Sequence, residues 1–270
     1  MLMKKLLFLI ILATTFGACE DVVEVDLNEG TPKLVIEANF EKQIGVDDFI
    51  LRVTLSKTIP FFNSDPEFVN DAVVTITPEN ENAIVVPFIE DGRYALSTIE
   101  PESGVPYTLE ITVDGETYSA TEMLVTGVPL EFVEQDNEGG FSNDEIELKA
   151  FFTDPPDTEN YYFFEGLSSR GYVADALTDE FFDGNQIFGF YSVDDLEAGD
   201  QVTFYLSGVD EQFYNFMFTL LQQSGDQGGG PFETQPATVR GNIVNQTNEA
   251  NFPLGYFRVS EVSLLTYTVE

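Results

Sequence analysis

Alternating apolar and polar positions predict that most of this chain consists of β-strands. The clearest examples are "KLVIEANF" (33–40) and "FILRVTLS" (49–56), which are rich in apolar and β-branched residues. "YTLEITVDGETYSATEM" (107–123) holds two such runs around Asp114 and Gly115. This pattern predicts a hairpin with a type I′ turn, because glycine readily adopts positive φ. Further strands are expected at 72–77, 83–89, 92–97, 145–154, 160–168, 181–192, 199–208 and 257–270.

One segment has the period of a helix instead. In "VDEQFYNFMFTLLQQSG" the apolar residues recur at i, i+3, i+4, i+7 and i+8, which predicts a helix near 210–224 with one apolar face. Ser207 and Asp210 are candidate N-caps, and Gly225 is the expected residue after the C-terminus. We expect the apolar face to pack on a sheet. Its members are Phe213, Phe216, Met217, Leu220 and Leu221.

Short strands separated by Gly, Pro, Asn and Asp predict a mainly all-β fold. We expect an Ig-like β-sandwich over 33–127, followed over 128–270 by a second β-rich domain with one amphipathic helix. "TGVPLEF" (126–132) is the expected hinge. Four consecutive aromatic residues at 161–164 place rings on both faces of one strand. We interpret that strand as buried between a sheet and the helix; exposed rings that stack on sugars are the alternative.

The N-terminus has the pattern of a secretory signal peptide, 1–18: two lysines, an apolar run and small residues. Cys19, the only cysteine, follows Gly17 and Ala18 as in a bacterial lipobox, although Phe16 stands where leucine is usual. We expect cleavage before Cys19 and its lipidation by diacylglycerol and fatty acids such as palmitate. Cleavage elsewhere, with a free thiol, is the alternative. Lipid chains hold a protein on a membrane without a spanning helix, and no later stretch reaches the ~18 apolar residues of one.

The charge balance is extreme, with 48 acidic and 11 basic residues and a net charge of −37. It argues against nucleic-acid binding and against attraction to an anionic membrane surface, since both need basic residues. The run "EDVVEVD" (20–26), within an expected acidic tether over 19–32, is similar to the export signal of surface lipoproteins in Bacteroidota. An ordinary acidic spacer is the alternative.

The absence of histidine removes Ser-His-Asp and Cys-His catalysis and the common His-containing zinc sites. Carboxylates in "TDPPDTEN" (153–160) and "SVDDLEAGD" (192–200) are the remaining candidates for a glycosidase pair. No run fits a calcium loop; "DNEGGFSNDEIE" (136–147) is only loosely acidic and favours a solvated loop. Glycines 228–230 lack the lysine of a phosphate loop. We therefore assign no catalytic residues, no metal and no cofactor, leave the ligand-binding residues open, and expect no enzyme.

Taken in order, several pieces resemble a known family, the Bacteroidota lipoproteins of domain of unknown function 4249. After the lipobox come "CEDVVEVDLNEGTPKLVIEA", "VTLSKTIPFF", "DAVVTI", "GVPYTLEITVDGETYSAT", "FTDPPDTENYYFF", "FFDGNQI", "GGGPFETQPATVRGNI" and "LGYFRVSEVS". The match is weakest between 167 and 181. The resemblance transfers no catalytic residues. Because members are often encoded beside TonB-dependent receptors, it implies an accessory lipoprotein on the outer membrane, exposed at the cell surface.

Three functions remain open at this stage. The first is a binding lipoprotein that captures a nutrient or peptide for a TonB-dependent receptor. The second is a structural or adhesive envelope protein that acts through protein contacts, for example by pairing at an edge strand. The third is a carboxylate-based glycoside hydrolase, which needs two buried carboxylates with raised pKa in one cleft. An aromatic-lined cleft would favour the first.

Overall fold

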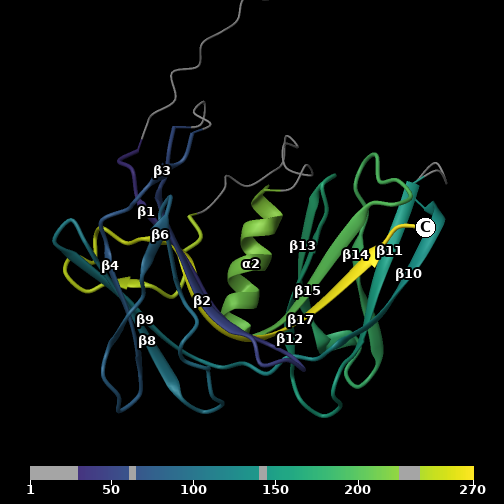
Figure 1. Ribbon diagram of the computed structural model, residues 1–270, viewed down its shortest axis with the longest axis horizontal. Coiled ribbons are helices and arrows are strands. Elements are labelled where there is room, and N and C mark those ends of the chain that lie inside the picture. The colour runs from purple at the N-terminus through teal and green to yellow at the C-terminus, as the bar shows by residue number, and fades with distance from the viewer. Residues whose placement is uncertain (1–29, 61–64, 140–144, 225–237) are drawn as a thin grey trace, which may run out of the picture. The chain divides into compact units, whose positions relative to one another are not determined.

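The computed structural model describes residues 30–60, 65–139, 145–224 and 238–270. Residues 32–270 form one compact unit, shown in Figure 1. The predicted signal peptide, Cys19, the acidic run 20–26, Gly225 and glycines 228–230 lie outside the described residues. Within the described ranges, no helix is long and apolar enough to cross a membrane.

The first sandwich packs two sheets around one hydrophobic core. The alternation of β1 explains its burial: Ile36, Ala38 and Phe40 are fully buried in that core, while Glu37 is exposed on the other face. One sheet is β16 (Val244–Asn245), β9 (Glu116–Met123), β8 (Pro106–Val113), β4 (Val73–Pro78) and β5 (Ile84–Val85). The facing strands are β1 (Leu34–Gln43), β2 (Phe49–Lys57), β7 (Arg93–Leu96) and β6 (Phe88–Glu90), with β3 (Glu67–Phe68) beside β2.

The hairpin β8–β9 has the predicted turn. Asp114 has φ of 52° and Gly115 has φ of 78°, the two positive values that a type I′ turn requires. The strands then pair in register from Val113 with Glu116 to Pro106 with Met123.

The second sandwich has its own core, and the aromatic run at 161–164 explains why. Tyr162 and Phe164 enter this core, while Tyr161 and Phe163 face the helix, so the strand lies between sheet and helix as predicted. One sheet is β10 (Leu130–Gly139), β11 (Glu145–Thr153) and β14 (Gln186–Tyr191). The other holds β13 (Tyr172–Thr178), β12 (Tyr161–Leu167) and β15 (Gln201–Val209), with the 3-10 turn η1 (Asp179–Phe181) after β13.

The last strand, β17 (Leu254–Thr268), joins the two sandwiches. Its first part pairs in parallel with β1, from Leu254 to Val262, and its second part pairs antiparallel with β15, from Val262 to Thr268. The result is one nine-stranded sheet through both sandwiches. The chain is therefore mainly β, with sandwich-like packing and one helix among the described residues, as predicted. The domain boundary expected at 127/128 stays a prediction. β16 and the start of β17 follow this position in the sequence, but they pair with strands of the first sandwich.

The helix α2 (Glu211–Ser224) covers the outer face of this sheet, and Figure 1 shows it between the strands of the two sandwiches. Asp210 is its N-cap, because Oδ1 accepts the amide N–H of Phe213 at 2.6 Å. The predicted apolar face packs against Phe163 and Tyr256. The other N-cap candidate, Ser207, is buried within β15.

Four strands of the described residues were not predicted: the two-residue strands β3 and β16, and the longer strands β10 and β13. The expected hinge at 126–132 runs directly into β10, whose exposed face carries many acidic and amide side chains and so hides the alternation. The strand β13 reads "YVADALT", in which alanine and aspartate are poor strand formers. It forms because β12 supplies seven paired positions, from Tyr161 with Thr178 to Leu167 with Tyr172.

Candidate functional site

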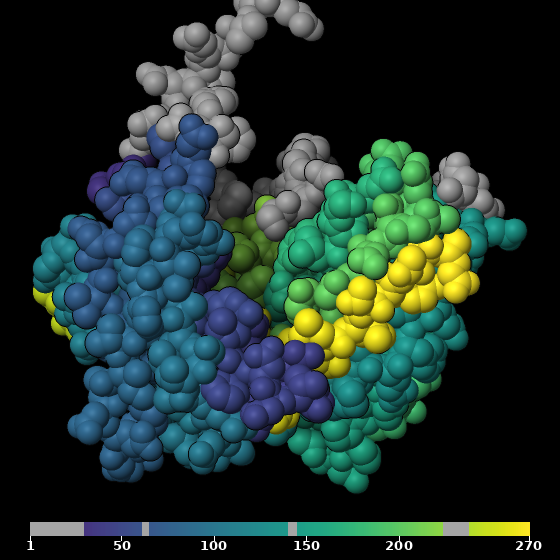
Figure 2. Space-filling view, in the orientation of Figure 1, coloured from purple at the N-terminus to yellow at the C-terminus, as the bar shows by residue number. Residues whose placement is uncertain are grey.

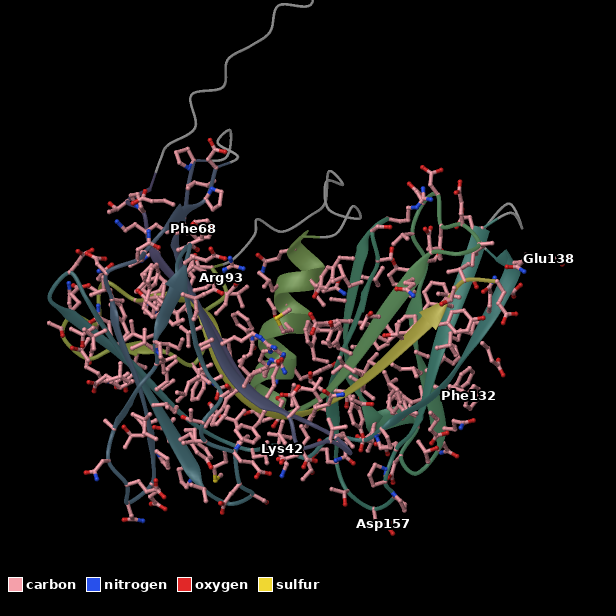
Figure 3. The ribbon with its side chains drawn as sticks, in the orientation of Figure 1. Lys42, Phe68, Arg93, Phe132, Glu138 and Asp157 are labelled. Carbon is pink, nitrogen blue, oxygen red and sulfur yellow. The ribbon has the colours of Figure 1, made fainter. Side chains whose placement is uncertain are left out.

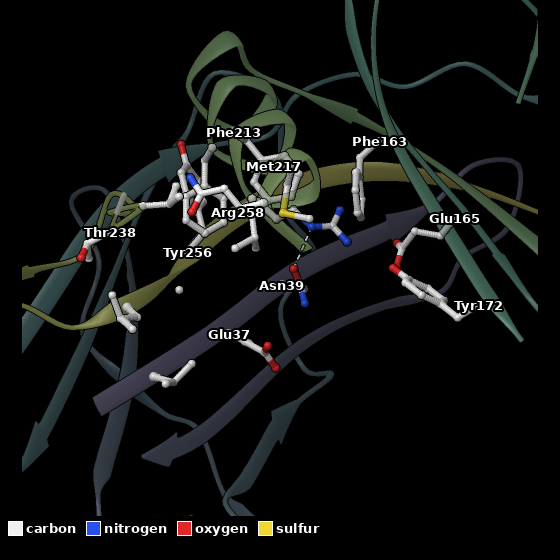
Figure 4. Close-up of a pocket in the computed structure, with 17 residues that line it drawn as sticks. Glu37, Asn39, Phe163, Glu165, Tyr172, Phe213, Met217, Thr238, Tyr256 and Arg258 are labelled. Atoms are coloured by element: carbon white, nitrogen blue, oxygen red, sulfur yellow. Dashed lines mark hydrogen bonds between the residues drawn. The ribbon is translucent and has the colours of Figure 1, made fainter. Parts of the chain in front are cut away.

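A groove of about 630 Å³ lies between α2 and the outer face of the nine-stranded sheet. We call it the α2 groove; it is lined by residues of β1, β12, β13, α2 and β17, together with Thr238 and Val239. Figure 2 shows the surface hollowed over α2, and Figure 4 shows the lining side chains. Its volume is within the range of about 300–1,000 Å³ that is usual for small-ligand sites.

The wall that α2 supplies is mainly apolar, with Gln223 as its polar member. Four residues of the predicted apolar stripe line the groove: Phe213, Phe216, Met217 and Leu220. The first three also pack toward the sheet. Leu220 lies at the edge of the stripe, where it is 39% exposed. Phe213 packs edge-to-face on Phe163, with ring centroids 5.5 Å apart. An apolar ligand surface placed here would leave water and gain the usual hydrophobic stabilisation.

The sheet side carries a buried cation, Arg258 of β17, whose side chain is only 8% exposed. Arg258 Nε donates to Asn39 Oδ1 at 2.7 Å, and Nη2 donates to Glu41 Oε1 at 2.8 Å. Both partners come from β1, which the parallel pairing places alongside. Nη1 is buried and has no hydrogen-bond partner among the described residues. A buried N–H donor without an acceptor lowers the stability of the folded protein by about 1–3 kcal/mol, so an unpaired Nη1 at this position is unusual.

Two carboxylates also line the groove, Glu37 of β1 and Glu165 of β12. Glu165 Oε1 accepts the hydroxyl of Tyr172 at 2.7 Å across the β12–β13 pair. Burial and Glu165 raise the pKa of Tyr172; Arg258 opposes the rise and Glu37 adds to it, so all three charges act near this hydroxyl. In Figure 4 the guanidinium of Arg258 points toward Glu165 and Tyr172. Among the described lining residues, the charged groups are two carboxylates and one guanidinium.

A second polar cluster lies beneath the N-terminus of α2. Glu122 and Asp210 line a cavity of about 10 Å³, room for about one water molecule. Burial raises the pKa of Glu122 to about 7; a hydrogen bond from Asn242 opposes this, and the charge of Asp210 adds to it. The hydroxyls of Tyr256 and Ser260 are buried without a partner in the described structure. A sugar ring does not fit this cavity, so the cluster gives no support to glycoside hydrolysis.

The acidic segments singled out in the sequence lie elsewhere. Asp154, from 153–160, is buried beside Asp179 and Asp183, with their oxygens within 4.8 Å of one another. Oxygen ligands suit a hard cation, but Asp154 already accepts from Tyr162, and nothing further in the described residues points to an ion. In 192–200, Asp200 is held by Arg170 Nε at 2.9 Å. Neither segment lines the α2 groove.

Aromatic side chains also gather on the outer face of the β10–β11–β14 sheet. Phe132 is 40% exposed and stacks on Phe151 at 4.8 Å, and Phe151 contacts Phe188 at 5.2 Å. Figure 3 shows Phe132 on this sandwich. The face has no hollow described beside it, so the α2 groove is the better candidate for a ligand site.

Sequence reasoning missed the polar residues of the groove. A signal was present for Arg258, because it interrupts the apolar strand "GYFRVS" in a chain with few basic residues. Nothing in the sequence distinguished Glu37 and Glu165 from the other acidic residues. Cys19, the predicted lipidation site, lies outside the described residues and stays a prediction.

Comparison with protein families gives a match over most of the chain. The model of "Domain of unknown function (DUF4249)" matches residues 20–265. The chain belongs to this family. The match spans both sandwiches, α2 and the whole of the groove, which are therefore parts of one DUF4249 unit. The resemblance to domain of unknown function 4249 that was stated from the sequence is confirmed.

Other comparisons add little about the function of this DUF4249 chain. No curated protein matches it. Among solved structures, a cytokine receptor complex is 8% identical, covers 67% of this chain and 86% of its own, and has a TM-score of 0.27. A two-domain fibronectin type III segment from chicken tenascin is 14% identical, covers 67% and 92%, and has a TM-score of 0.22.

Proposed function

We propose that this chain is a ligand-capturing lipoprotein whose binding site is the α2 groove. The groove supports the proposal because it combines an apolar helix wall with a small number of convergent polar groups, the composition typical of binding pockets. The unpaired Nη1 of Arg258 is the observation that carries it, since a bound acceptor would remove the cost of that buried donor. The site binds and releases its ligand without chemistry.

The location and the partner extend this proposal. The predicted lipobox and acidic tether support a location on the outer membrane with display at the cell surface, and the family's association supports a TonB-dependent receptor as the partner. The chain would then collect a ligand and pass it to that receptor. A structural or adhesive role predicts instead that the groove is dispensable.

Blocking the groove tests the proposal. Leu220→Trp adds bulk at the groove wall, where the side chain is 39% exposed and the core is undisturbed. Phe218→Trp is the matched control, because Phe218 is on the same helix, is 45% exposed and does not line the groove. In a deletion strain, the wild-type chain and Phe218→Trp should restore receptor-dependent uptake, and Leu220→Trp should not. Full restoration by Leu220→Trp would show that the groove is not the site.

The partner is tested separately with the same strains. A tagged full-length chain should co-purify with a TonB-dependent receptor from detergent-solubilised membranes, in all three forms. If no such receptor co-purifies, and deletions of the chain and of its neighbouring receptor gene give unrelated phenotypes, the receptor part of the proposal fails. The binding part would then be judged by direct measurement of ligand binding to the wild-type chain and to Leu220→Trp.

A further inference from the structure

The charged groups of the α2 groove define what kind of ligand it takes. Glu37 is exposed and has no ion-pair or hydrogen-bond partner in the part of the chain that the structure describes, so its charge is available to a ligand. Glu165 accepts only the Tyr172 hydroxyl there, and a carboxylate can accept several hydrogen bonds. These two carboxylates favour a cationic group, and the net charge of −37 would steer one toward the protein.

Arg258 does not cancel this preference. Arg258 and Arg52 share the carboxylate of Glu41, each at 2.8 Å, so the three carboxylates Glu37, Glu165 and Glu41 outnumber these two arginines and leave the groove net negative. The guanidinium still has the unpartnered Nη1, which is buried, and Arg258 lines both the α2 groove and the small cavity beneath the N-terminus of α2. A neutral acceptor such as a carbonyl oxygen satisfies that donor without bringing a negative charge toward the two carboxylates. The groove therefore offers places for a cation and, near it, an uncharged acceptor.

The remaining surface is the apolar wall of Phe213, Phe216, Met217 and Leu220. A chemical group that carries a cation, a neighbouring carbonyl and an apolar substituent is the first residue of a peptide with a free amino terminus. Capture of a terminal amine is a known mode of peptide recognition. Resting on the proposed function, we infer that the α2 groove binds peptides through a free amino terminus, with the ammonium at Glu165, the charge of Glu37 adding to the negative field, the first carbonyl toward Arg258, and apolar side chains on α2.

Two matched probes test this inference. Trileucine amide has a free amine and no carboxylate, and N-acetyl-trileucine amide differs only in lacking the charge. In isothermal titration calorimetry with the mature chain, trileucine amide should bind saturably, and acetylation should weaken binding by at least about tenfold, the scale of a charge-assisted hydrogen bond. Free leucine amide should bind more weakly than the tripeptide; equal binding would indicate a site for single amino acids and would overturn the peptide assignment.

Variants identify the residues that act. Glu165→Gln with Glu37→Gln should weaken trileucine amide to the level of its acetylated form and leave the acetylated form unchanged. Glu110→Gln, on the exposed face of β8 away from the groove, is the matched control and should change neither. Equal binding of both probes to the wild-type chain would overturn amine recognition but leave groove binding standing. Absence of saturable binding by trileucine amide would overturn the inference, whereas unaltered binding of both probes to Leu220→Trp would contradict the proposed function itself.

Discussion

Replacing Glu122 by glutamine should stabilise the protein at neutral and higher pH. Glu122 lies on β9 beside the N-terminus of α2, and Asn242 Nδ2 donates to its Oε1 at 2.6 Å. Burial raises the pKa of Glu122 from 4.5 to about 7, in spite of that hydrogen bond and with the added charge of Asp210. Glutamine keeps the size and the acceptor oxygen but carries no charge.

The sign follows from proton binding. A carboxyl whose pKa is higher in the folded state binds its proton more tightly there, so the free energy of unfolding falls as the pH rises from about 4.5 to about 7. At about 1.4 kcal/mol per tenfold change in acid constant, the cost above that range is at most about 3.5 kcal/mol. Since the side chain is only partly buried, solvent screening reduces this to about 1–2 kcal/mol.

Urea unfolding gives the measurement, followed by far-ultraviolet circular dichroism because the chain has no tryptophan. Glu122→Gln should raise the free energy of unfolding by about 1–2 kcal/mol at pH 8 and by less than about 0.5 kcal/mol at pH 4, where the wild-type carboxyl is protonated in both states. Glu110→Gln, on the solvent face of β8, is the control variant measured beside it at both pH values. A lower stability of Glu122→Gln at pH 8 would mean that the carboxylate is ionised and stabilising, and would refute the reasoning.

Three further substitutions test the packing and electrostatics by the same method. Phe164→Ala removes a fully buried ring of the second core and should cost about 3–5 kcal/mol; a loss below about 1 kcal/mol would show that the ring is not packed there. Gly255→Ala should cost at least about 1 kcal/mol, since Gly255 has φ of 95° and a Cβ would meet the carbonyl oxygen of Ile36; an unchanged urea midpoint would argue against this backbone. Burial raises the pKa of Asp179, and the charge of the nearby Asp154 adds to this. Asp179→Asn should therefore stabilise the protein more at pH 7 than at pH 3, and the exposed Asp183→Asn should show a smaller difference between the two pH values. The reverse order of the two variants would contradict the burial of Asp179.

The sequence predicted the elements in which local pattern and tertiary environment agree. The alternation at 33–40 corresponds to β1 because one face meets the core and the other meets solvent or the groove. The hairpin at 107–123 was equally clear, since Asp114 and Gly115 supply the turn. The helical stripe was correct for the same reason, because four of its five members, all except the partly exposed Leu220, belong to the cluster that holds Phe163 and Tyr256.

What could not be predicted depends on partners distant in sequence. β17 follows a path from β1 to β15, and no local pattern specifies a parallel pairing between the first and last strands. The polar residues of the groove could not be predicted for the same reason, because Arg258 contacts Asn39 and Glu41 only through the pairing of β17 with β1. Tyr172 of the unpredicted β13 is brought to Glu165 in the same way.

The most direct test of the central claim is to map where a ligand binds. Backbone amide chemical shifts of the isotope-labelled mature chain should be recorded during a titration with trileucine amide. The account predicts saturable changes at groove residues such as Glu37, Glu165 and Leu220, and none at Glu110 and Thr121 on the five-stranded sheet. Saturable changes confined to other faces, with the groove amides unmoved, would contradict the claim that the α2 groove is the ligand site.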